Sequence, residues 1–271
     1  MVVNTPIYPP FLHTVHDSGR TLVESPVVWR DGRPRLDLAG LADAFATGVT
    51  AYLLCNPHNP TGLVPTADEL AEILALAERH GVLVVSDEAH GPLTYPNATF
   101  TPVLTLPGAD RVAVAVTSAS KAWNIPGLKT AALVVPGEDR RKTLLDLSVR
   151  TRMGASILGV HANVAAWTGG REWLAEVLDY LDGNRRLLAE LLAAQVPGIR
   201  YAVPDATYLA WLDCRELGLD DPAATLLERG DIALSDGATF GTPGIGWLRL
   251  NFATPRPLLE EQVRRIARAL S

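Results

Sequence analysis

Four short polar segments of the sequence carry residue types that can bind an anion or move a proton. Three of them directly follow a run of apolar, strand-forming residues, and the fourth lies inside such a run. They are Asn56–Gly62 (NPHNPTG), Ser86–His90 (SDEAH), Thr117–Lys121 (TSASK) and Trp247–Phe252 (WLRLNF). Ligands of open α/β sheets bind at the carboxyl ends of the strands, so we expect the first three segments to meet at one site.

The first two segments offer an amide and a carboxylate. Asn59 lies in a turn fixed by two prolines and a glycine, where its side chain can reach a bound molecule. Asp87 ends the apolar run before it, and an acid at that place can pair with a cation. Both residues also have a structural interpretation, because proline-rich turns are common without function and an acid after a strand often caps a helix.

The third and fourth segments supply cations. Ser118 and Ser120 suit an anionic phosphate, and Lys121 beside them is a candidate reactive amine. The alternative is a solvated lysine on a polar loop. Arg249 alone interrupts an apolar strand, so we expect it to need a carboxylate from the protein or from a substrate.

Continuous apolar runs must position these segments, and runs without alternation are typical of strands buried on both faces. They cover residues 50–55, 82–86, 112–117 and 131–135. Between the first two runs, Thr66 and Glu69 form a capping-box pattern, and helical spacing of apolar residues predicts a helix over 66–80. A strand, a helix and a strand in this order predict a parallel α/β sheet.

From about Glu138 the pattern changes to long helices and short strands. We expect helices over 138–150, 156–167, 171–195, 222–229 and 257–270, and strands over 206–213, 232–235 and 247–252. These elements predict a smaller α+β domain. The chain would then divide into a large domain, residues 1–168, and an interdomain helix with a small C-terminal domain, residues 169–271.

Composition narrows the class of protein. The 271 residues are 48% hydrophobic and 20% charged, as in globular proteins, and the net charge of −6 disfavours nucleic acid as a partner. No apolar run is long enough to span a bilayer and the first residues lack a signal-peptide pattern, so we expect no membrane partner. Two cysteines far apart, Cys55 and Cys214, fit a reducing, cytoplasmic location. His13 and His16 lie in a stretch that we expect to be a loop, with no third ligand nearby, so we expect no metal.

Taken in order, the four segments resemble one known family. Asn-Pro-x-Asn-Pro-Thr-Gly, Asp-Glu-x-His, Ser-x-Ser-Lys and a late Arg-Leu-Asn strand are similar to the fold type I pyridoxal 5′-phosphate (PLP) enzymes of the class I/II aminotransferase superfamily. The resemblance spans the whole chain and implies PLP as cofactor, a large α/β domain with a mainly parallel sheet, and a smaller C-terminal α+β domain. Four stretches resemble the cystathionine β-lyase, or C–S lyase, branch: Tyr8–Phe11, Ser86–His90, Ser120–Gly127 and Thr207–Asp213.

The resemblance implies roles for residues around the cofactor ring. Lys121 resembles the lysine that forms a Schiff base with PLP and then moves protons at the substrate Cα. Asp87 matches the acid that pairs with the pyridinium nitrogen. Asn59 and His90 match donors to the 3′-oxygen, and Tyr8 matches an aromatic that stacks on the ring.

The same resemblance implies contacts to the phosphate and to the substrate. Ala89 is expected against the second face of the ring, and Ser118, Ser120 and Lys129 match ligands of the phosphate. Arg249 resembles the arginine that clamps the substrate α-carboxylate, with Asn59 also at the substrate.

The family's catalytic domain normally begins well upstream of the point that corresponds to Val2. The resemblance therefore implies a large domain truncated at the N-terminus. It would lack an N-terminal arm, a helix, a strand and a turn that helps to bind the phosphate.

The C–S lyase resemblance implies a β-elimination that converts cystathionine or another cysteine S-conjugate to a thiol, pyruvate and ammonia. Two alternatives stay open. One is a class I/II aminotransferase, which shares all of these residues, and the other is an inactive fragment or non-catalytic remnant, which the missing phosphate turn favours. The implied partners are a small amino-acid substrate and, in the full-length form, a second copy in a homodimer.

Overall fold

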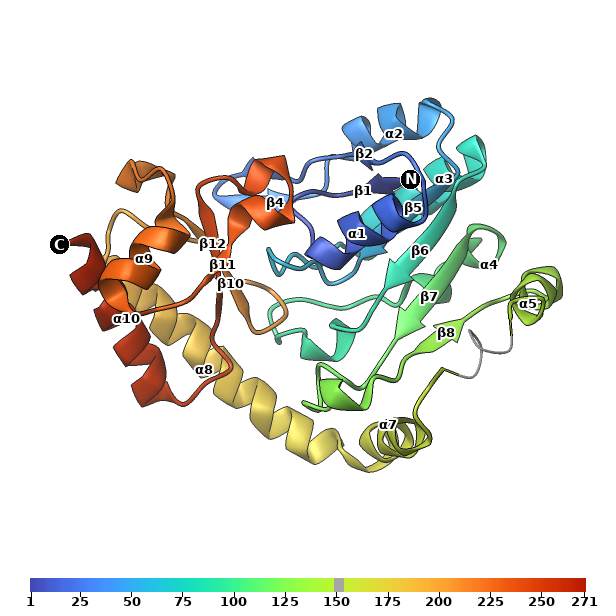
Figure 1. Ribbon diagram of the computed structural model, residues 1–271. Helices are drawn as coiled ribbons and strands as arrows, with labels where there is room; N and C mark the ends of the chain where they lie inside the picture. The colour runs from blue at the N-terminus through green and yellow to red at the C-terminus, as the bar shows by residue number, and fades with distance from the viewer. Residues whose placement is uncertain (149–153) are drawn as a thin grey trace.

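The computed structural model describes residues 1–148 and 154–271, and its centre is a six-stranded sheet in the order β2-β1-β5-β6-β7-β8 (Figure 1). Neighbouring strands are parallel except β7 and β8, which are antiparallel. The strands are β1 (Val2–Val3), β2 (Val23–Glu24), β5 (Ala51–Cys55), β6 (Leu83–Asp87), β7 (Ala113–Thr117) and β8 (Ala132–Val134). The predicted parallel α/β sheet is confirmed.

Helices cover both faces of this sheet, which explains the continuous apolar runs. On one face, α2 (Leu38–Ala46), α3 (Ala67–His80) and the short α4 (Ala109–Val112) enclose the larger part of the core. The expected capping box starts α3: the Glu69 amide donates to Thr66 Oγ1 at 3.1 Å, and the Thr66 amide donates to Glu69 Oε2 at 2.7 Å. Two backbone amides at the helix start that lack a partner within the helix are therefore hydrogen-bonded.

The other face carries α1 (Pro9–Asp17), where the prediction of a loop was wrong. Its two prolines occupy the first turn, where a missing N–H costs nothing, and Val15 is buried against the sheet. His13 and His16 are exposed on this helix. A pair of prolines indicates a turn in the sequence. The helix that follows has only one buried position, so no apolar periodicity indicated a helix there.

The second half of the described chain builds a four-stranded antiparallel sheet in the order β11-β12-β10-β9. Its strands are β9 (Arg200–Tyr201), β10 (Leu209–Asp213), β11 (Ser235–Asp236) and β12 (Trp247–Asn251). Three helices share a core with it: the long α8 (Arg171–Gln195), α9 (Pro222–Gly230) and α10 (Arg256–Leu270). Figure 1 shows α8 running from the side of the large sheet to the small one.

The remaining elements connect these parts. Between β7 and α8 lie β8, α5 (Glu138–Leu145) and α7 (Ile157–Gly169), and the last two residues of the helix predicted over 138–150 fall outside the described residues. A small hairpin joins β3 (Val28–Arg30) to β4 (Arg33–Arg35). Short 3₁₀ turns span Gly91–Leu93, Val103–Thr105, Pro126–Leu128, Arg215–Leu217, Gly237–Phe240 and Thr242–Gly244.

An apolar surface lies along β8 and α7. Strand β8 is the last strand of the large sheet, and the α7 side chains Ile157 and Leu158 are 67% and 69% exposed. Leu133 and Val134 of β8 are also exposed. Exposed apolar side chains promote association, and so does a strand that has no neighbour on its outer side, as is the case for β8 within the described residues.

We therefore expect replacement of Ile157 and Leu158 by glutamate to lower self-association of the 271-residue chain, measured by light scattering over a concentration series. Leu227→Glu is the matched control, because Leu227 is similarly exposed on α9, away from this surface. Equal scattering by the α7 variant and the control would contradict the prediction.

Candidate functional site

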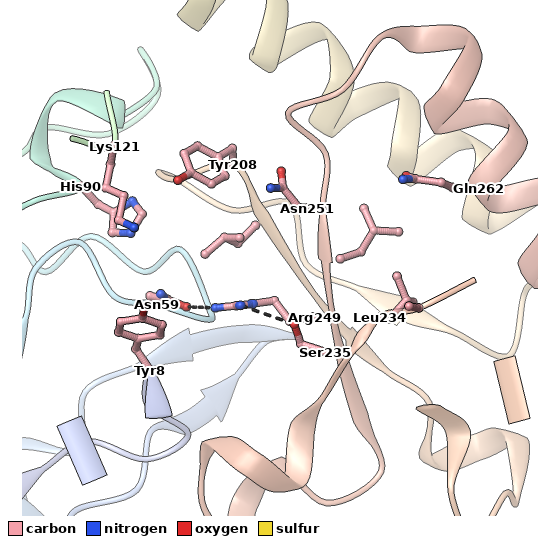
Figure 2. Close-up of a pocket in the computed structure, with 13 residues that line it drawn as sticks. Tyr8, Asn59, His90, Lys121, Tyr208, Leu234, Ser235, Arg249, Asn251 and Gln262 are labelled. Atoms are coloured by element: carbon pink, nitrogen blue, oxygen red, sulfur yellow. Dashed lines mark hydrogen bonds between the residues drawn. The ribbon is translucent and has the colours of Figure 1, made fainter. Parts of the chain in front are cut away.

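A pocket of about 320 Å³ opens between the carboxyl ends of the large sheet's strands and the small sheet (Figure 2). This volume lies at the lower end of the range for small-molecule sites. Loops after β5, β6 and β7 bring Asn59, His90 and Lys121 to it, and Tyr8 comes from the start of α1. Tyr208, beside β10, and Arg249, on β12, line the opposite wall.

The pocket therefore brings together five of the residues singled out in the sequence, namely Tyr8, Asn59, His90, Lys121 and Arg249. Asp87 lines a second hollow, which shares Tyr8 with the first. The other expected positions, Ala89, Ser118, Ser120 and Lys129, are not among the lining residues of either hollow.

The Ser118 hydroxyl is engaged in its own loop. It donates to the Thr130 carbonyl at 2.6 Å and accepts from the Ser120 amide at 3.0 Å. Lys129 is exposed in a left-handed conformation, with φ 46°. Ser118 thus shapes the turn that leads into Lys121, whatever else it binds.

Arg249 is a partly buried cation without a carboxylate partner among the described residues. Its Nη1 donates to Asn59 Oδ1 at 3.0 Å, and its Nη2 donates to Ser235 Oγ at 3.4 Å. The guanidinium also lies 4.8 Å from the centre of the Phe240 ring. Burial lowers the pKa of Arg249, because the charged guanidinium is removed from water. An incoming anion would offset this loss of solvation energy.

Asp87 is a largely buried carboxyl at the end of β6. Burial raises its pKa, while the Ala89 amide, which donates to Oδ1 at 3.1 Å, and the charge of Lys121 act in the opposite direction. No arginine, lysine or histidine lies within ion-pair distance of it among residues 1–148 and 154–271. A cationic ring nitrogen is the kind of group that such a carboxylate stabilises.

His90 is buried beside Tyr208, with ring centres 5.9 Å apart, and its Nδ1 has no hydrogen-bond partner within the described chain. Burial is the main reason that its pKa falls to about 3, and the charges of Lys121 and Arg249 lower it further. The imidazole is therefore neutral near pH 7. Its free nitrogen suits a polar atom of a bound molecule.

The pocket is also lined by four polar residues for which sequence analysis predicted no role, namely Tyr208, Ser235, Asn251 and Gln262. Ser235 stands opposite Arg249 in the β11–β12 register, a pairing between strands that no local pattern reveals. Tyr208 lies within a stretch that resembles the C–S lyases, which is the one signal that could have identified it.

The described residues form neither a metal site nor a membrane-spanning helix. Over the described ranges, no three histidine, cysteine or acidic side chains lie close enough to hold a metal ion. None of the helices in the described part of the chain is long and apolar enough to cross a membrane.

Acid should destabilise the fold through His58, which lies in the turn after β5. Burial lowers its pKa from 6.5 to about 4, while Nδ1 contacts Thr61 Oγ1 at 2.9 Å and Nε2 contacts the Asn4 carbonyl at 3.1 Å. Between these two pKa values the unfolded chain binds the proton and the folded chain does not, so stability falls as the pH falls through that window. From pH 7 to pH 5 we expect this residue to account for a loss of about 2 kcal/mol.

Urea unfolding at both pH values measures this loss, and the His58→Asn variant should lose less stability on acidification. The buried carboxyls Asp87 and Glu88 have raised pKa values and act in the opposite direction at lower pH, which makes the comparison with the variant necessary. The same loss in the variant as in the parent would contradict the assignment.

The sequence of this chain is similar to sequences of known proteins. A family model described as "Aminotransferase class I and II" matches residues 1–270. "Cystathionine beta-lyase" from Corynebacterium glutamicum is 36% identical over 274 residues, and "Cystathionine beta-lyase PatB" from Bacillus subtilis (strain 168) is 34% identical over 277 residues. Each alignment covers 100% of this chain and 71% of the relative.

A solved structure shows the same architecture. The PLP-bound C-S lyase from Staphylococcus hominis matches 99% of this chain and 71% of its own with a TM-score of 0.92, at 28% sequence identity. The fold of this chain is thus shared with a structure that is described as PLP-bound.

Proposed function

This chain belongs to the class I and II aminotransferase family, and we propose that it is a PLP-dependent carbon–sulfur β-lyase acting on cystathionine or other cysteine S-conjugates. The observation that carries the proposal is Arg249, a cation that has no carboxylate partner among residues 1–148 and 154–271 and that shares one pocket with Lys121. An amino-acid substrate supplies the missing carboxylate and brings its Cα near a lysine amine.

The residues of the site fit PLP. Asp87 is a largely buried carboxyl with no cation at ion-pair distance in the described part of the chain, which suits a protonated pyridine nitrogen. The neutral His90 has a ring nitrogen without a described partner, which suits the 3′-oxygen together with Asn59. Tyr8 and Ala89 would contact the two faces of the ring. When bound, PLP supplies an electron sink for the electron pair left at the substrate Cα.

We assign the phosphate to Ser118, Ser120 and Lys129, which belong to the loop that carries Lys121 and to the turn after it. This assignment rests on the family resemblance alone. To donate to a phosphate oxygen, the Ser118 hydroxyl would rotate and give up its bond to the Thr130 carbonyl.

The chain's own side chains then perform the steps around the substrate. Arg249 binds the α-carboxylate with its two parallel N–H groups and thereby fixes the orientation of Cα. Lys121 Nζ removes the Cα proton, the bond between Cβ and sulfur breaks, and the sulfur leaves with the electron pair of that bond and is protonated to a thiol. Water converts the remaining three-carbon fragment to pyruvate and ammonia.

The test is pyruvate release from cystathionine by PLP-loaded protein, compared with transfer of the amino group to a keto acid. We expect pyruvate release to be faster. Faster amino-group transfer would assign the chain to the aminotransferases, and absence of both activities would favour a non-catalytic remnant.

The proposal also includes a domain boundary, a cellular location and a partner. We propose a division of the chain at residues 168 and 169, because α8 shares its core with the small sheet. We also propose a cytoplasmic location, consistent with two free buried thiols. A second copy of the chain is the proposed partner, and the exposed apolar side chains of α7 support it.

A further inference from the structure

The guanidinium of Arg249 lies over an aromatic ring and has no carboxylate beside it. Its central carbon is 4.8 Å from the centre of the Phe240 ring. No acidic side chain of residues 1–148 and 154–271 pairs with it. A cation within about 6 Å of a ring centre is attracted by the electron-rich face of that ring. Phe240 therefore gives this partly buried charge some of the stabilisation that a carboxylate would otherwise supply.

An aromatic partner differs from a carboxylate in what it leaves free. A carboxylate would cancel the charge of Arg249 and occupy its N–H groups, and a substrate would have to displace it. The ring does not cancel the charge. Figure 2 shows the two hydrogen bonds of the guanidinium, to Asn59 Oδ1 at 3.0 Å and to Ser235 Oγ at 3.4 Å. The guanidinium has more N–H groups than these two contacts use, so donors remain for an incoming carboxylate.

Phe240 is itself fixed in place. Its side chain is buried, and its ring centre lies 5.2 Å from that of Trp211. Its carbonyl accepts from the Ile7 amide at 2.8 Å. Because Ile7 precedes Tyr8, this bond also connects the Arg249 side of the pocket to the Tyr8 side. A ring held by packing and by its backbone can keep a neighbouring cation in one position.

The aromatic cluster around Phe240 continues into the small sheet. Trp211 stands opposite Arg249 in the β10–β12 register, and its ring centre lies 5.5 Å from that of Trp247. Trp247 in turn stacks on Trp29 of β3 at 4.9 Å. Truncating Phe240 would leave a cavity in this cluster and lower stability for that reason alone. A test of its contact with the cation therefore needs a replacement that keeps the size of the ring.

We propose that Phe240 is a positioning residue for the carboxylate site: its ring holds the Arg249 guanidinium at the pocket and leaves the charge and the free N–H groups for the substrate α-carboxylate. This inference rests on the proposed function, in which Arg249 binds that carboxylate. Phe240 is not among the residues that line the pocket, so it acts through Arg249 alone. Weakening the face of its ring should raise KM and leave kcat nearly unchanged, because substrate binding is lost and the reacting groups are not altered.

The experiment replaces Phe240 by ring-fluorinated phenylalanines, in which fluorine withdraws electron density from the ring face and changes the ring's size little. With trifluorophenylalanine we expect KM for cystathionine to rise about three- to tenfold and kcat to stay within about twofold of the parent. Monofluorophenylalanine should give an intermediate KM. The parent KM in both fluorinated proteins, with pyruvate still released, would overturn the inference and leave the lyase function standing.

The same replacements at Phe45 are the matched control. Phe45 is as buried as Phe240 and also has an aromatic neighbour, Tyr52, with ring centres 5.6 Å apart. It belongs to the core of the large sheet, away from Arg249. Fluorination there should leave KM unchanged, and an equal rise in KM at both positions would show a general effect of fluorine on packing and reject the positioning role.

A binding measurement covers the case in which cystathionine is not cleaved and the proposed function itself fails. Absorbance titrations of PLP-loaded protein with L-alanine and with ethylamine compare two amines, of which only alanine carries a carboxylate and neither carries a leaving group. Trifluorophenylalanine at position 240 should weaken the affinity for alanine about three- to tenfold and leave that for ethylamine unchanged. An equal change for both amines, or no change for alanine, would reject the positioning role, whatever reaction the protein performs.

Discussion

Replacing Lys121 by alanine should reduce pyruvate release from cystathionine by about a thousandfold, because a positioned general base contributes roughly 10²–10⁴ in rate. Lys121 is the one lysine that lines the described part of the pocket, and it faces the carboxylate-binding Arg249. The measurement is single-turnover pyruvate formation with saturating PLP. Circular dichroism of the variant checks that the fold is kept.

Lys142→Ala is the control for this result. Lys142 is exposed on α5 and pairs with Glu138 at 3.5 Å, away from the pocket. It should retain the parent rate. A Lys121→Ala protein as fast as the parent would show that another base removes the Cα proton.

Replacing Arg249 by lysine should lower kcat/KM for cystathionine about ten- to a hundredfold while PLP binding persists. An ammonium cannot reproduce the paired N–H groups that a guanidinium offers to a carboxylate, and losing a charge-assisted hydrogen bond costs about 1.5–3 kcal/mol. The variant also loses one of the donors that hold Asn59 in place. Steady-state kinetics and PLP absorbance measure the two properties separately.

Arg229→Lys, at an exposed position of α9, serves as the matched control and should behave like the parent. A different result with Arg249→Lys would contradict a role of Arg249 in substrate binding. If the variant were less stable but its soluble fraction bound cystathionine with the parent affinity, Arg249 would be a structural residue that holds the small sheet to the Asn59 turn.

The sequence was sufficient to predict strands β5 to β8 of the large sheet, and the reason is local. Strands β5, β6 and β7 are buried on both faces, so the sequence of each is a continuous apolar run. The start of α3 is indicated by the capping-box residues Thr66 and Glu69. Strands β2 and β9 have two residues each and carry no such signal. Helix α1 was missed because its buried contribution is the single residue Val15.

The site was predictable in part for a similar reason. Asn59, His90 and Lys121 each follow a strand of the large sheet, so parallel topology alone brings them together. Ser235 and Gln262 reach the pocket through the pairing of β11 with β12 and the packing of α10. The hydrogen bond between Arg249 and Asn59 joins residues 190 positions apart, a closeness that only the folded chain reveals.

If Lys121 and the pocket around it form a PLP site, reductive trapping should attach the cofactor to that lysine. Borohydride treatment of PLP-loaded protein, followed by proteolysis and mass spectrometry, should place the phosphopyridoxyl group on the peptide that contains Lys121. The label should be absent from that peptide when the protein is reduced before PLP is added. A label confined to Lys129 or Lys142, or spread evenly over surface lysines, would show that Lys121 is not the lysine that binds PLP.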